Sequence, residues 1–353
     1  MSTPRMALIS DDLTGALDSA VPFALAGWNT VVATSPASLD RALNCGADVV
    51  AVSLNSREAS KPEASARARH AALALSHVPV LFKKIDSRMK GHVRDEVLAL
   101  ARVRALGRVI VCPAIPELGR FVVDGCVTGH GITTPIPVAF PADGHTDVAC
   151  PDAGTDADLD RILARSDGAL LVGARGLASA LARRMGAPAT HSQPLSHPSA
   201  PISLAIGSRD PVTLVQVVRL REAYPSAHYV PAIDGVLLEV PTFAEVTIIQ
   251  VTDGGGGLDG AIVSHRLAAG LASGLPNGCR TLLLTGGETA SACLGALGIG
   301  VLKLLGEVQP GLPISMPLDF PDAPHIVTKS GGFGEPDSLT NLVRVAMDQS
   351  RAA

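Results

Sequence analysis

The chain has 353 residues, of which 47% are hydrophobic and 18% are charged, and its formal net charge at pH 7 is −4. At about 150 residues per domain, this length predicts about two domains. Aromatic residues make up only 3% of the sequence, so a stacking surface for single-stranded nucleic acid is poorly supplied, and the acidic balance argues against a duplex-binding protein. We expect no nucleic-acid partner, whereas a small anionic ligand needs only local positive charge.

Targeting and metal-binding signals are missing from the sequence. The amino-terminal stretch MSTPRMALISDDLTG holds a very short apolar run followed by two acids, which does not build a secretory signal. The uncharged run 289–302 is far shorter than the roughly 20 apolar residues of a membrane span. The six cysteines form no CxxC pair and the ten histidines no HExxH, so no metal site built from protein ligands is predicted. We expect a cytoplasmic protein with no membrane partner.

In the first half, short β-branched runs alternate with Ala/Leu-rich amphipathic stretches, which is typical of a parallel sheet covered by helices on both faces. The predicted strands are 6–10, 30–34, 48–54, 80–85, 108–112 and 169–173. The predicted helices are 15–26, 63–76, 92–105 and 175–184. The Pro/Gly-rich segment 113–151 predicts irregular loops and short hairpins beside a cleft.

A linker is predicted at 185–201, where four prolines stand among Ser and His without periodicity. The domains would therefore span 1–190 and 200–353. In the second, the predicted strands are 202–207, 247–252, 281–285 and 325–328, and the predicted helices are 211–222, 258–272, 289–297 and 337–349. The expected fold class is α/β, with two three-layer domains, mainly parallel sheets and an active site in the inter-domain cleft.

Two acids, Asp11 and Asp12, follow the first predicted strand in the sequence SDDLTGA. Open α/β sheets place their ligands at such strand ends. Adjacent carboxylates there can accept hydrogen bonds from a polyol, act as a general base or hold a metal. The alternative is that Asp12 or Thr14 only caps the following helix.

Two further loops carry charge. The sequence KKIDSRMKGH at 83–92 places several cations, Asp86 and Ser87 at a strand-to-helix turn, which favours an anion-recognition site over a merely solvated loop. The rigid, proline-bearing loop 112–120 would present Arg120 to the same cleft.

The second half contains glycine-bearing turns at 207–211, 285–290 and 329–334, each after a predicted strand. Free backbone N–H groups and paired glycines allow a phosphate to approach the main chain, so three such turns favour a nucleotide-phosphate cradle. No GxxxxGK[ST] motif occurs. The glycines at 255, 257 and 260 match GxGxxG, but no acid lies between 261 and 287 to bind a ribose, which argues against a dinucleotide fold.

The sequence resembles the four-carbon acid sugar kinases, a two-domain family. The resemblance is carried by SDDLTGALDSA at 10–20, KKIDSRMKG at 83–91, CPAIPELGRFVVDG at 112–125, GSRDPVT at 207–213, TGGETASACLGALGI at 285–299 and KSGGFGEPDSL at 329–339. It implies an N-terminal domain that binds a small-molecule sugar acid (threonate, erythronate or 3-oxo-tetronate) and a C-terminal domain that binds ATP. Phosphoryl transfer would go to the terminal hydroxyl of the acid.

The resemblance also implies roles for residues. On the substrate side it places Asp11, Asp12, Asp86, Ser87 and Arg120, and on the nucleotide side Ser208, Gly286, Gly287, Glu288, Thr289, Gly331 and Gly332. The chain departs from the family pattern at Arg88, which replaces Thr, at Lys90, which replaces Arg, and at Glu288, which replaces Asp. We also expect it to be some tens of residues shorter than typical members of the family, with the deficit around 224–260 and 313–325.

Our mechanistic hypothesis places Mg²⁺–ATP on the three glycine turns and the sugar carboxylate on Lys84, Lys90 and Arg120. Asp12 or Asp86 would deprotonate the attacking hydroxyl, with Asp12 favoured by its position at the mouth of a helix. The alternative function is a binding protein derived from this family that recognises a sugar acid or nucleotide without turnover. Ala-rich helices with little charge could support a homodimer.

Overall fold

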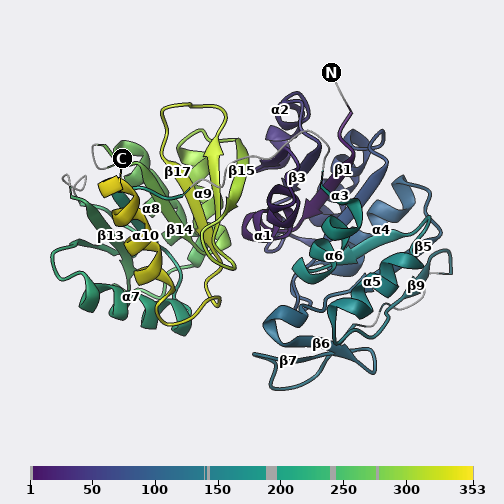
Figure 1. The fold of residues 1–353 in the computed structure, drawn as a ribbon. Coiled ribbons are helices and arrows are strands. Elements are labelled where there is room, and N and C mark those ends of the chain that lie inside the picture. The colour runs from purple at the N-terminus through teal and green to yellow at the C-terminus, as the bar shows by residue number, and fades with distance from the viewer. Residues whose placement is uncertain are drawn as a thin grey trace. The chain divides into compact units, whose positions relative to one another are not determined.

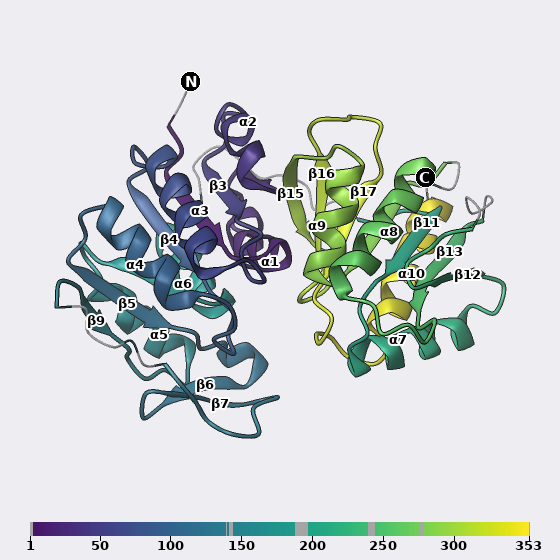
Figure 2. The same cartoon turned by 180° about the vertical axis from the view of Figure 1, so that it is seen from behind.

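The computed structural model describes residues 3–138, 140, 144–187, 197–238, 244–275 and 278–352. The chain divides into two compact units, Met1–Ser192 and Gln193–Ala353, coloured purple to teal and green to yellow (Figures 1 and 2). Residues 188–196 of the predicted linker lie outside the described residues.

The first unit is built on a wholly parallel sheet with the strand order β2-β3-β1-β4-β10-β5-β9. Its strands are β1 (Met6–Ser10), β2 (Thr30–Ala33), β3 (Val49–Ser53), β4 (Val80–Lys84), β5 (Arg108–Cys112), β9 (Asp147–Ala149) and β10 (Leu170–Gly173). All the strands predicted for this half are confirmed within one residue, because they are the almost continuously buried apolar runs that a parallel sheet requires. The short edge strand β9 was not predicted.

Helices cover the two faces of this sheet. They are α1 (Leu13–Leu25), α2 (Leu39–Leu43), α3 (Lys61–Ala74), α4 (Val93–Val103), α5 (Asp156–Ala164) and α6 (Arg175–Met185), with 3₁₀ turns η1 (Pro36–Ser38) and η2 (Pro116–Leu118). α6 packs on both α1 and α5, whereas α3 packs on α4. Right-handed crossovers place these two groups on opposite faces of the sheet. Helix α5 was not predicted, although its capping box between Thr155 and Asp158 marks its start.

The Pro/Gly-rich segment forms the predicted hairpins. β6 (Arg120–Val123), β7 (Cys126–Gly129) and β8 (Ile136–Pro137) make a small antiparallel sheet. Residues 139 and 141–143 lie outside the described residues.

The second unit has the strand order β12-β13-β11-β14-β17-β16-β15. Its strands are β11 (Ile202–Ile206), β12 (His228–Ile233), β13 (Val246–Thr252), β14 (Thr281–Thr285), β15 (Val301–Glu307), β16 (Pro313–Pro317) and β17 (His325–Lys329). β16 runs antiparallel to β15 and β17, and the other pairings are parallel. The four predicted strands are confirmed, whereas β12, β15 and β16 were missed.

The helices of the second unit are α7 (Pro211–Ala223), α8 (Gly260–Ser273), α9 (Gly287–Ala296) and α10 (Ser338–Ala352), each overlapping a predicted helix. α7 packs on α10 and α8 on α9. Leu220 of α7 and Leu342 of α10 share a buried core with strand residues such as Leu204. No helix among the described residues is long and apolar enough to cross a membrane.

Candidate active site

Two loops carry the predicted acids of the first unit, and they leave neighbouring central strands in opposite directions. β1 leads through α1 to β2 on one side of the sheet, and β4 leads through α4 to β5 on the other. Such a switch point is the usual ligand position in open α/β sheets. Asp11 and Asp12 follow β1, and Asp86 lies in the loop after β4. The loops are in contact, because a Cβ on Gly91 would lie 3.1 Å from Asp11 Oδ2.

Asp12 is the N-cap of α1. Its Oδ1 accepts a hydrogen bond from the Gly15 N–H at 3.1 Å, and its Oδ2 accepts one from Thr14 Oγ1 at 2.8 Å. The capping alternative is thus confirmed for Asp12. The cap also fixes this carboxylate at the carboxyl edge of the sheet, with 15% of its side chain exposed.

Arg57 joins the acids and was not predicted. The Ser56 N–H donates to the Asp11 carbonyl at 2.9 Å, which extends the pairing of β1 with β3 and brings Arg57 alongside. Arg57 Nε donates to Asp11 Oδ2 at 2.7 Å and Nη2 to Asp12 Oδ1 at 3.0 Å, while Nη2 lies 3.9 Å from Asp86 Oδ2. A usable signal existed, since Arg57 follows the predicted strand 48–54 and so belongs to the same edge as Asp11 and Asp12.

The two adjacent acids differ in the direction in which their pKa values are shifted. Burial acts to raise the pKa of Asp11, but the charges of Arg57, Lys83 and Lys84 together hold it below its usual value. For Asp12 burial prevails, so its pKa is raised despite the attraction of Arg57. Asp11 is therefore suited to remain ionised, and Asp12 is suited to accept a proton.

The two adjacent lysines of β4, Lys83 and Lys84, lie in different environments. Lys83 is fully buried and its Nζ lies 2.5 Å from Glu96 Oε2 on α4, while Ser56 Oγ donates to the other oxygen of Glu96. Lys84 lies on the opposite side of the strand, where a Cβ on Gly15 would come within 2.9 Å of its Nζ. Lys84 thus reaches the start of α1 beside the acids, as a substrate-binding role requires, whereas Lys83 is a structural ion pair.

Arg120 contacts the loop that follows β4. Arg120 Nη1 donates to Ser87 Oγ at 2.6 Å, so the two predicted substrate residues are in contact. Asp86 Oδ1 accepts the Arg88 N–H at 2.7 Å and shapes the turn. The Lys90 side chain is exposed, and only its backbone N–H approaches Asp86, at 3.5 Å.

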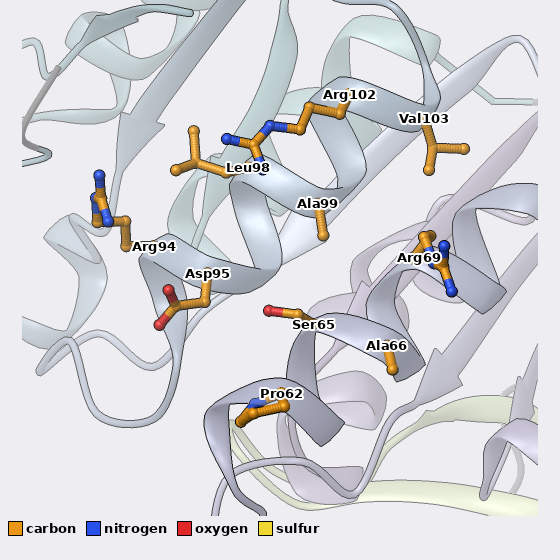
Figure 3. A pocket seen from close by; sticks show the side chains of 10 residues that line it. All are labelled: Pro62, Ser65, Ala66, Arg69, Arg94, Asp95, Leu98, Ala99, Arg102 and Val103. Carbon is orange, nitrogen blue, oxygen red and sulfur yellow. The ribbon is translucent and has the colours of Figure 1, made fainter. Parts of the chain in front are cut away.

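A separate surface groove lies between α3 and α4 and has a volume of about 480 Å³ (Figure 3). Its lining includes Arg69, Arg94 and Arg102 but none of the predicted site residues. It is therefore distinct from the acids at the edge of the sheet.

In the second unit, the three predicted glycine turns follow the adjacent strands β11, β14 and β17. They meet closely. A Cβ on Gly207 would lie 2.8 Å from Thr289 Cβ, and one on Gly331 would lie 3.2 Å from Ser208 Cβ and would collide with its Oγ. β11 leads through α7 to one side of the sheet and β14 through α9 to the other, so this is also a switch point. The predicted residues Ser208, Gly286, Gly287, Thr289, Gly331 and Gly332 therefore lie together.

The helices α7 and α9, which both begin at this edge, differ in how their N-termini are capped. Asp210 caps α7 by accepting the Val212 N–H at 2.9 Å. The N-cap of α9 is Gly286, at φ +88°, and it supplies no side chain to the first N–H groups. An uncapped helix start next to a glycine turn suits a phosphate group. Glu288 lies in the first turn of α9, and a Cβ on Gly260 at the start of α8 would lie 3.1 Å from its Oε2.

Lys329 stabilises the third glycine turn, at 329–334, through its side-chain hydrogen bonds. Its buried ammonium donates to Thr213 Oγ1 and to the carbonyls of Ser330 and Gly331, at 3.0–3.1 Å. Burial lowers the pKa of Lys329 to about 8, although Asp210 acts to raise it. Its donors are thus occupied in holding the turn. Among the residues that the structure describes, no group of three or more His, Cys, Asp or Glu side chains could hold a metal ion.

Two family models match this chain. A sugar-binding N-terminal domain matches residues 6–139, and a nucleotide-binding C-terminal domain matches residues 241–339. The first contains the acids and Arg57, and the second contains two of the three glycine turns.

Characterised relatives match over almost the whole chain. A D-threonate kinase of Cupriavidus necator is 33% identical, with 98% of each chain covered, and one of Bordetella bronchiseptica is 32% identical, with 99% covered. A 3-oxo-tetronate kinase of Methylobacterium radiotolerans is 29% identical over 93% of this chain and 96% of its own. The first alignment spans 422 positions against the 353 residues here, so that relative has segments that this chain lacks.

Solved structures share the fold. A Salmonella typhimurium protein superimposes with a TM-score of 0.74 at 20% identity, covering 95% of this chain and 98% of its own. A Haemophilus influenzae protein gives a TM-score of 0.67 at 19% identity, covering 97% and 100%.

A sugar-binding unit and a nucleotide-binding unit, each with its predicted residues gathered at a switch point, define a two-domain sugar kinase. The full-length relatives make the assignment narrower. The chain belongs to the four-carbon acid sugar kinase family.

Proposed function

We propose that this protein transfers the γ-phosphoryl group of ATP to the terminal hydroxyl of a four-carbon acid sugar, with D-threonate as the first acid to test. The D-threonate kinases above are 33% and 32% identical to it, against 29% for the 3-oxo-tetronate kinase. The first unit would bind the acid and the second the nucleotide, in keeping with the domains 1–190 and 200–353 predicted from the sequence.

The observation that carries the proposal is the cluster of Asp11, Asp12 and Arg57. Asp11 is 4% exposed, and its Oδ1 has no hydrogen-bond partner among the described residues. A buried carboxylate oxygen without a donor is costly unless a ligand supplies one. A sugar hydroxyl is such a donor, so Asp11 would orient the acid while Asp12, the more basic of the two, takes the proton from the attacking oxygen.

On the nucleotide side, the Gly287 N–H at the start of α9 and the turn at Gly331 would receive the phosphates of ATP. The Gly286 N–H is already bonded to the Lys329 carbonyl, at 2.9 Å, so Gly286 would contribute by leaving the main chain accessible. Mg²⁺ would neutralise charge on those phosphates when bound. Its ligands would be mainly phosphate oxygens, with Glu288 as a carboxylate close to the turn. The chain itself fixes the glycine turns through Lys329 and keeps the start of α9 open.

A coupled assay of ADP formation tests the function. We expect turnover with Mg²⁺–ATP and D-threonate, D-erythronate or 3-oxo-tetronate, and none with threitol, which lacks the carboxylate. Calorimetry under the same conditions addresses the non-catalytic alternative. Binding of acid and ATP without ADP formation would favour a binding protein, and absence of both would contradict the family function here.

Replacing Arg57 by Gln tests the electrostatics of the acid pair. Removing this cation disfavours ionised carboxylates, so the pKa values of Asp11 and Asp12 should rise. Because catalysis needs Asp12 ionised, the acid limb of the kcat/KM profile should move to higher pH. An Arg69→Gln variant, which removes an equal charge from the groove between α3 and α4, should keep the wild-type profile. An unmoved acid limb in the Arg57 variant would refute the assignment of Asp12 as the group whose ionisation limits catalysis at low pH.

A further inference from the structure

The cations of the first unit's site are not all balanced by acids of the chain. Arg57 is paired with Asp11 and Asp12, and Lys83 with Glu96. Within the described part of the chain, neither Arg88 nor Arg120 has a carboxylate within 4.0 Å. This end of the site therefore carries surplus positive charge.

Arg120 is the buried member of this pair, at 6% exposure. Its hydrogen-bond acceptors among the described residues are neutral: Ser87 Oγ accepts from Nη1, and the His130 carbonyl accepts from Nε at 3.2 Å and from Nη2 at 2.9 Å. A guanidinium has five N–H donors, so two are left. Burial and the nearby charge of Arg88 lower the pKa of Arg120. Asp86 acts in the opposite direction but forms no ion pair with Arg120. Buried charges are normally compensated by a counter-ion, and none lies within 4.0 Å of Arg120 in the described part of the chain.

Arg88 faces the same place from the loop after β4. Asp86 holds its N–H at 2.7 Å, and the next residue, Met89, has φ +59°, which together fix the turn. A Cβ on Gly131 would lie 2.7 Å from Arg88 Nη2 and 3.4 Å from Arg120 Nη2. Both guanidinium groups thus lie against one glycine of the loop between β7 and β8, at φ +70°.

We propose that Arg88 and Arg120 together bind the carboxylate of the acid substrate and that Arg88 determines selectivity for an acid over the corresponding polyol. This inference rests on the proposed function. Two adjacent guanidinium groups offer parallel N–H donors that match a carboxylate. The acid would then lie with its carboxylate at Ser87 and its hydroxyls toward Asp11 and Asp12. Arg88 and Lys90, which was predicted for the carboxylate, are both exposed, and we favour Arg88 because its guanidinium lies at Gly131 beside that of Arg120.

The test is binding of D-threonate to the nucleotide-free protein by calorimetry, with threitol, inorganic phosphate and ATP as separate probes. Arg88→Gln should weaken D-threonate binding about ten- to a hundredfold, because a charged hydrogen-bonded contact is lost. Arg88→Lys, which keeps the charge but not the fork, should be intermediate. Arg69→Gln is the matched control for net charge. In turnover, Arg88→Gln should raise the KM for D-threonate more than it lowers kcat.

Unchanged D-threonate affinity in Arg88→Gln would overturn the inference. If that variant also lost affinity for ATP or inorganic phosphate, Arg88 and Arg120 would be assigned to a phosphate group instead. Wild-type protein that binds D-threonate without phosphorylating it would overturn the proposed function and not the carboxylate site. Wild-type protein that binds none of D-threonate, D-erythronate and 3-oxo-tetronate would overturn both.

Discussion

Asp12→Asn should lower kcat for D-threonate by about 10²–10⁴-fold, the usual contribution of a general base. The reason is that Asp12 combines a position at the switch point with a pKa that burial raises above its usual value, which makes it a better proton acceptor than an ordinary carboxylate. Asn cannot take that proton. It caps helices about as well as Asp, so α1 and the thermal stability of the protein should be nearly unchanged. Steady-state kinetics beside thermal unfolding would measure both effects.

Asp86→Asn is the matched comparison, because it makes the same chemical change at the other predicted base. Asp86 Oδ1 accepts the Arg88 N–H, and an amide oxygen can continue to do so. We expect a loss of less than about tenfold, well below that of a general base. If Asp86→Asn were the more damaging variant, Asp86 would be the base, and near wild-type turnover in both variants would exclude both acids from this role.

Gly331→Ala should weaken ATP binding by about 5- to 150-fold and leave binding of D-threonate to the nucleotide-free protein unchanged. The new methyl group would collide with Ser208 Oγ and lie 3.3 Å from Asp210 Cβ, so the third turn must move away from the first. Overpacking of this kind costs about 1–3 kcal/mol, which gives the expected range if the strain is relieved by the displaced turn.

Gly295→Ala provides the control in the same unit. Gly295 lies inside α9, and a Cβ there would have nothing within 4 Å. Ala should therefore stabilise the helix by up to about 1 kcal/mol and keep wild-type ATP affinity. Calorimetric titration with ATP distinguishes the two variants. Wild-type affinity in a correctly folded Gly331→Ala protein would show that contact between the turns is not needed for the nucleotide.

The strands that the sequence predicts are those buried on both sides, since parallel central strands read as unbroken apolar runs. The missed strands break this pattern. β12 has an interior proline and a largely part-exposed face, β15 contains Lys303 and Gly306, and β16 begins and ends with proline. Antiparallel and edge positions tolerate such residues, so their pattern could not be distinguished from loops.

The site could be predicted where chemistry is concentrated in a short motif, as in SDDLTGA or the glycine turns. Arg57 was missed because its one signal, its position just after the predicted strand 48–54, is not reinforced by a motif of its own. Its role arises only when the pairing of β1 and β3 brings it to Asp11 and Asp12. Arg88 was counted among the cations of the predicted anion-recognition loop 83–92 and noted as a departure from the family pattern, but it was not paired with Arg120, because their proximity depends on the fold of the loop around Gly131.

The pair Lys83 and Lys84 has a consequence for how the chain reaches its native alignment. Successive side chains of a strand point to opposite faces, so a shift of β4 by one residue would exchange the two ammonium groups. Glu96 can form an ion pair only with the lysine that points to its face of the sheet, which is Lys83 in the native alignment. We infer that this interior pair selects the alignment of the strand that carries Lys84 and leads into Asp86 and Ser87. Chemical-shift heterogeneity along β4 in a Lys83→Leu, Glu96→Leu protein would reveal the loss of that selection, and a single set of signals would contradict it.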